Sequence, residues 1–158
     1  MLGRLYYASL DAIAVSVVTD LFWVGSPTDA ITVIEEILIT QETLETSEQL
    51  PLRVFRTTTD NSAAGTGGVV NPAEVGSPAY GGVVRHNISG GSLSAETTPL
   101  FSIAQNILNG WHWLPTPEHR IVLTPAAGTA GRLAVKLDTA PGSGLTVSGY
   151  MVLREIGG

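Results

Sequence analysis

Apolar and polar residues alternate with a period of two along several parts of the chain. This alternation runs through residues 12–18, 30–40, 50–55, 133–138 and 145–153. One apolar face at a period of two is what a half-buried antiparallel strand requires. Eighteen glycines and nine prolines separate such segments. The pattern predicts an all-β fold of about eight to ten short strands, an antiparallel jelly-roll-like β-sandwich in which the N-terminal and C-terminal strands pair.

Residues 99–109 are compatible with two kinds of element. Leu100, Ile103 and Ile107 lie close to helical spacing, which would suit a short helix. We expect a strand here and keep the short helix as the alternative. The second half of residues 35–49 could also turn once or twice, but its β-branched residues and the alternation before it favour a strand running into a loop.

Residues 57–82 form a loop-like segment rich in glycine and small polar residues. Its few large apolar side chains include Val69, Val70 and Tyr80, too few to build a core of their own. We therefore expect one long loop, mobile in the free protein and ordered as a contact arm in an assembly. Shortening it should leave the sandwich folded, because loop closure depends only weakly on length.

The chain has 158 residues and no composition shift that would mark a second domain, so residues 1–158 are expected to form one domain. There is no cysteine, which excludes disulfides and thiolate ligands. The net charge is −6 with only eight scattered basic residues, which argues against a nucleic-acid partner. No apolar stretch approaches the ~18 residues of a membrane span. Charged residues make up only 14% of the chain, so we expect part of the surface to be covered by another subunit.

The sequence offers little for catalysis or metal binding. His86, His112 and His119 are far apart, and no His-x-His pair occurs. Gly-x-Ser-x-Gly is also absent. The adjacent Glu35 and Glu36 should point to opposite faces of a strand and cannot share a substrate directly. Either Glu35 sits beside a β-bulge, or it pairs with a basic residue such as Arg53 or Arg56 on a neighbouring strand. We expect no catalytic residue, no metal and no cofactor.

The most specific local feature is the pair Trp111 and Trp113, which alternation places on one face of a strand. Three interpretations remain open: packing in the core or at the sandwich edge, contact with another subunit, or stacking on a carbohydrate. The candidate interface residues are Trp111, Trp113, Tyr80, Val69 and Val70.

Four segments in this order resemble a family of small virion proteins of tailed bacteriophages. They are residues 20–41 (DLFWVGSPTDAITVIEEILITQ), 77–84 (SPAYGGVV), 110–123 (GWHWLPTPEHRIVL) and 145–156 (LTVSGYMVLREI). The resemblance spans roughly residues 3–156 and rests on order and texture, without a catalytic motif. It implies a jelly-roll or tumour-necrosis-factor-like β-sandwich that forms dimers or trimers on a virus particle.

Together these features predict a non-enzymatic structural protein. We expect a capsid decoration (cement) protein on the virion surface, with itself and the major capsid protein as partners and no membrane partner. The alternative is a tail, fibre or collar component that binds a host glycan or receptor.

Overall fold

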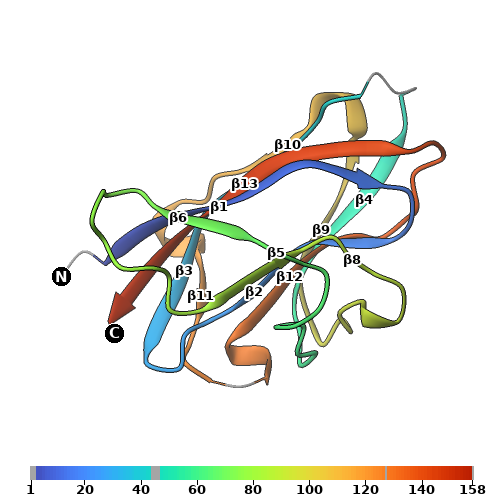
Figure 1. The fold of residues 1–158 in the computed structure, drawn as a ribbon. Helices are drawn as coiled ribbons and strands as arrows, with labels where there is room; N and C mark the ends of the chain where they lie inside the picture. Colours follow the sequence, from blue (N-terminus) through green and yellow to red (C-terminus); the bar gives the residue numbers. More distant parts are fainter. Residues whose placement is uncertain (1–2, 44–46, 127, 158) are drawn as a thin grey trace.

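The computed structural model describes residues 3–43, 47–126 and 128–157, which form two antiparallel sheets packed face to face (Figure 1). Sheet A contains β1 (Arg4–Val15), β3 (Ala30–Gln41), β6 (Val69–Pro72), β10 (Trp111–Trp113), β11 (Ile121–Leu123) and β13 (Leu145–Gly157). Sheet B contains β2 (Thr19–Gly25), β4 (Gln49–Arg56), β5 (Thr66–Gly67), β7 (Val83–His86), β8 (Ile88–Ser89), β9 (Thr98–Asn106) and β12 (Arg132–Leu137). The helical elements of the described residues are four short 3₁₀ turns: η1 (Gly90–Ser92), η2 (Ile107–Asn109), η3 (Pro117–His119) and η4 (Gly128–Ala130).

The strand order within the sheets is that of a jelly roll. Sheet A runs β10-β3-β13-β1 with β6 added beyond β1, and sheet B runs β9-β4-β12-β2 with β7 and β5 added beyond β2. Most successive long strands lie in opposite sheets, which gives the double Greek key of a jelly roll. The predicted fold class is therefore confirmed, including the pairing of the first and last strands along β1 and β13.

Residues 99–109, for which strand and helix were both open, form mainly a strand. β9 pairs with β4 over its whole length, with one bulge. Only Ile107–Asn109 turns, as η2, and the side chain of Asn106 caps it by accepting a hydrogen bond from the N–H of Leu108.

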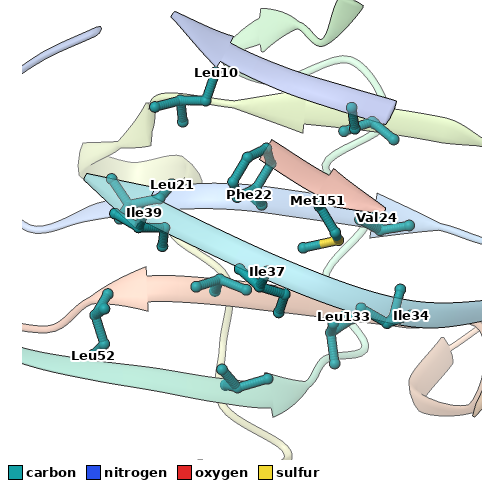
Figure 2. Packing of buried hydrophobic residues seen from close by; sticks show 14 of the residues in the cluster. Leu10, Leu21, Phe22, Val24, Ile34, Ile37, Ile39, Leu52, Leu133 and Met151 are labelled. Carbon is teal, nitrogen blue, oxygen red and sulfur yellow. The ribbon is translucent and has the colours of Figure 1, made fainter. Parts of the chain in front are cut away.

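The core lies between the two sheets and is built from their inward alternate positions. Figure 2 shows Phe22, Ile37 and Met151 from β2, β3 and β13 pointing into this space. Each is fully buried. Burial of such a side chain contributes about 1.5–3 kcal/mol, so the layer between the sheets accounts for most of the apolar stabilisation.

Strand β2 is buried on both of its faces, which is why it lacks a clear alternation. All seven of its residues are buried. The pairing with β12 shifts register opposite Leu21, so Leu21 and Phe22 both enter the main core. Trp23 lies on the other face and forms a second small cluster with Phe55, Ile88 and Ala134, against which Ala64 packs.

Residues 57–82 differ from the expected loop, because contacts within the chain fix much of the segment. β6 pairs with β1, and β5 pairs with β7. The carbonyl of Thr59 accepts a hydrogen bond from the indole N–H of Trp23, and the buried amide of Asn61 donates to the carbonyl of Ser92 and the hydroxyl of Ser94. The prediction of a structureless connection is wrong, because polar hydrogen bonds hold residues 57–64 against the outer side of sheet B and strand pairing adds β6 to sheet A, neither of which composition reveals.

Candidate functional site

An aromatic cluster closes the sandwich where the edges of the two sheets meet. Phe101 comes from β9, the edge strand of sheet B, while Trp111 and Trp113 come from β10, at the edge of sheet A. The Phe101 ring stacks on Trp113 at 5.7 Å between centroids and is tilted against Trp111 at 6.1 Å. All three side chains are half-buried and pack against the core. Their alternation along β9 and β10 directs them inward, across the gap between the sheets.

An open groove of about 560 Å³ lies beside this cluster. Its apolar wall includes Leu100, Phe101 and Trp113, and its basic side chains are Arg56, His119 and Arg120. The guanidinium of Arg56 donates to the carbonyls of Val122 and Ala130 at 2.9 and 3.2 Å. Arg120 lies 2.8 Å from a carboxylate oxygen of Glu35. Because both arginines already have internal partners, the groove suits an apolar or peptide-like occupant better than a bare anion.

The outer face of sheet A carries several exposed apolar side chains. We define this face by Tyr7, Val69, Val122 and Ile156, which are 44%, 59%, 42% and 37% exposed. The middle of this outer face is apolar too. Tyr7 lies opposite Val152 of β13, and Val122 lies opposite Val33 of β3, in the strand register. The outer side of sheet B differs, because residues 57–64 bury its Trp23 and Phe55.

The paired glutamates of β3 lie at a β-bulge on this same face. Val152 is opposite Glu36 and Leu153 is opposite Ile34, so Glu35 is the extra residue. The bulge turns both carboxylates outward, which corrects the expectation that they point to opposite faces and confirms the bulge alternative.

The basic partners of Glu35 are not the ones expected. Glu35 binds Arg154 of β13 and Arg120 from the segment before β11. Arg53 instead pairs with Glu96 and Asp138 on sheet B. The network therefore ties β3, β13 and the segment before β11 together, and it pairs the carboxylate of Glu35 within the face.

Glu36 joins a second polar group on the face. One of its carboxylate oxygens lies 2.8 Å from Nε2 of His112 and accepts a hydrogen bond from the Tyr150 hydroxyl at 2.7 Å. That hydrogen bond raises the pKa of the Tyr150 hydroxyl, with burial adding to the rise. The cluster offers an acid and a base but sits on a flat sheet, and the groove beside Phe101 is lined by neither Glu36 nor His112.

The five sequence-predicted interface residues fall into different environments. Val69 is exposed on the outer face of sheet A, whereas Val70 is half-buried against the core. Tyr80 is only 9% exposed, its hydroxyl lies 2.8 Å from that of Thr32, and its ring lies 5.5 Å from that of Tyr6. These contacts make Tyr80 part of the hydrophobic core. Burial strongly raises the pKa of its hydroxyl.

Sequence reasoning missed the outer face of sheet A. A usable signal was present in residues 30–41, where both alternating phases carry apolar residues: Ile31, Val33 and Ile37 in one phase, and Ile34 and Leu38 in the other. A strand with one solvated face would carry polar side chains in one phase. Apolar residues in both phases therefore point to an outer surface that favours a partner.

The described residues contain neither a group of side chains placed to bind a metal nor a helix that could span a membrane. No group of three or more histidine, aspartate or glutamate side chains there is placed to hold a metal ion. In that same part of the chain, no helix is long and apolar enough to cross a membrane. Comparisons of the chain with protein-family models, curated proteins and solved structures found no match.

Proposed function

We propose that this protein is a non-enzymatic virion structural protein, a decoration protein that binds the outside of a bacteriophage capsid. The observation that carries the proposal is the outer face of sheet A, with Tyr7, Val69, Val122 and Ile156 exposed around internally paired charges. The sequence resemblance is the reason to expect a bacteriophage particle as the partner. The exposed outer face of sheet A is the surface that we expect to dock on it. The partner of this face is the major capsid protein.

The composition of the face suits a broad, shallow interface. Apolar side chains release water on docking, at about 25 cal/mol per Å² of apolar surface buried. The carboxylate of Glu35 is already paired with Arg120 and Arg154, so covering it leaves no isolated charge behind. A standard interface buries roughly 800 Å² on each partner. The outer face of sheet A spans six strands, so a partner could contact several of them at once. Repetition over a capsid, combined with self-association, would multiply a modest affinity.

Co-sedimentation with capsids tests this surface directly. Val69→Asp and Val122→Asp each place a charge on the face, and each should weaken capsid binding about tenfold or more by burying an unpaired carboxylate. Val75→Asp is the matched control, because Val75 is fully exposed at 102% and lies outside the sheet. Melting curves of all three variants should stay close to the parent. Equal binding of all variants, or no binding of the parent to any capsid, would contradict the proposal.

The alternative role, a tail, fibre or collar component that binds a glycan or receptor, is favoured by a different feature. The groove beside Phe101 and Trp113 presents aromatic surface next to Arg56 and Arg120, and aromatic rings stack on sugars. Glycan-array binding that is lost in Trp113→Ala, together with labelling of the tail alone, would support this role over decoration. Binding to no glycan, with labelling of the whole head, would support the decoration role.

A further inference from the structure

The free edge of β9 is the least protected sheet edge of the molecule. On the opposite side of the sandwich, the outermost strands are β6, with four residues ending in Pro72, and β5, with two residues. The edge of sheet A nearest β9 is split into β10 and β11, with three residues each. β9 has nine residues and pairs with β4 alone. Among the described strands it therefore offers the longest run of unpaired backbone.

The C-terminal part of β9, from Phe101 to Asn106, lacks the features that usually keep an edge strand from pairing with another chain. Folded proteins protect such edges with charged residues, prolines, bulges or very short strands. The segment Thr98–Asn106 (TPLFSIAQN) contains no charged residue. Its proline and its bulge both lie before Phe101. The stretch from Phe101 to Asn106 is thus a regular, uncharged and open edge.

The pairing with β4 fixes which backbone groups of β9 point outward. Pro51 of β4 has no N–H, and its carbonyl accepts a hydrogen bond from Asp138, on the side of β12. Successive residues of an antiparallel strand direct their backbone groups to opposite neighbours, so Leu52 faces β9. Leu52 lies opposite Ile103, which means that Ile103 bonds toward β4. Its neighbours Ser102 and Ala104, both exposed, direct their N–H and C=O groups away from the sheet.

We propose that this edge pairs with the β9 strand of a second copy of the chain, antiparallel, about a two-fold axis at Ile103. In that register Ser102 of one copy lies opposite Ala104 of the other, and each pair exchanges two backbone hydrogen bonds. Ile103 of one copy then lies opposite Ile103 of the other, and Phe101 of one copy lies opposite Gln105 of the other. No charge and no proline occurs among these residues. The two sheets B join into one continuous sheet.

The composition of β9 favours a second copy of the chain as the partner of this edge. A two-fold interface must be self-complementary, and an uncharged strand opposes no like charges in any antiparallel register. The same pairing extends over the neighbouring groove and would cover Leu100 and Trp113, which line it. This inference does not rest on the capsid role, because β9 and the outer face of sheet A are separate surfaces. Dimerisation in solution and loss of capsid binding are accordingly measured independently.

Sedimentation of the full chain with one edge variant tests the pairing. Ser102→Pro removes an outward N–H while keeping a backbone angle that an edge strand tolerates, so the fold should persist. The parent and the control Ser102→Ala should sediment as dimers, and Ser102→Pro should weaken dimerisation about tenfold or more. A melting curve for each variant separates loss of pairing from loss of folding. A monomeric parent, or a folded Ser102→Pro variant that dimerises as well as the parent, would overturn the proposal.

Cross-linking tests the register, and the absence of cysteine from the chain makes it unambiguous. Under oxidation, Ser102→Cys mixed with Ala104→Cys should form a disulfide-linked dimer, because residues facing each other in a hydrogen-bonded pair lie about 5.5 Å apart between Cα atoms. Each variant alone should stay uncross-linked. Cross-linking of Ser102→Cys with itself would move the axis to Ser102 and overturn the register, and no cross-link in the mixture would overturn the pairing.

Discussion

The carboxylate of Asp20 accepts a hydrogen bond from the backbone N–H of Ser94 at 2.8 Å, which joins β2 to the segment between η1 and β9. The side chain is fully buried, and its second oxygen, Oδ1, has no hydrogen-bond partner. Burial raises the pKa of Asp20, although the Ser94 hydrogen bonds and the charge of Lys136 oppose the rise. The folded protein therefore holds this proton more tightly than the unfolded chain does.

Asp20→Asn should make the free energy of unfolding less dependent on pH. Because the pKa of Asp20 is raised above its ordinary 3.8, the stability that it contributes falls as pH rises through the window that begins near that value. The amide keeps an oxygen for the Ser94 N–H and carries no charge, so the variant should match or exceed the parent near neutral pH. Urea unfolding at a series of pH values measures the difference, with the exposed Asp29→Asn as control. Parallel curves for parent and variant would contradict this assignment.

Asn61→Ala should destabilise the fold by about 1–3 kcal/mol, since it leaves buried polar groups without a partner. The amide of Asn61 is 3% exposed and donates to the Ser92 carbonyl and the Ser94 hydroxyl, at 2.9 and 3.0 Å. Asn71→Ala, at an exposed position of β6, should change the unfolding free energy by less than about 0.5 kcal/mol. Chemical denaturation compares the two. Equal stabilities would mean that the hydrogen bonds of Asn61 contribute nothing to the stability of the fold.

Trp113→Ala tests whether the Trp113 ring stabilises the fold by packing or serves only a contact with another molecule. Complete burial of a Trp makes such a truncation cost about 3–5 kcal/mol, so a half-buried Trp113 stacked on Phe101 should cost about 2 kcal/mol. The neighbouring Leu114 is 67% exposed, and Leu114→Ala should cost less than about 0.5 kcal/mol. Thermal or urea unfolding provides the measurement. A Trp113→Ala variant as stable as the parent would show that the ring serves only an external contact.

Strands with one apolar face were predictable, and strands without one were not. Residues 30–40, 50–55 and 145–153 fall within β3, β4 and β13, and residues 133–138 match β12 apart from Asp138. β2 was not predicted as a strand, because both of its faces are buried and its sequence therefore lacks alternation. The core buries Phe22, and residues 57–64 bury Trp23. β5 and β6 were not predicted either. They pair with distant strands through backbone groups that every residue possesses, so no residue type marks them in the sequence.

The candidate site was predictable only in part, for a similar reason. Trp111 and Trp113 stand out by residue type, and Val69 was identified from the apolar content of its segment. The pairing of Glu35 with Arg120 and Arg154 depends on register across three strands, and the local spacing had suggested Arg53 or Arg56 instead. The open edge of β9 became recognisable only once its single neighbour was known.

An electron-microscopy map of the particle that carries this protein tests the central claim most directly. The account predicts density for the sandwich at regularly repeated positions over the whole head, with Tyr7 and Val122 of sheet A turned toward the capsid shell. Density confined to the tail or to one vertex, or a head surface without the protein, would contradict the decoration role.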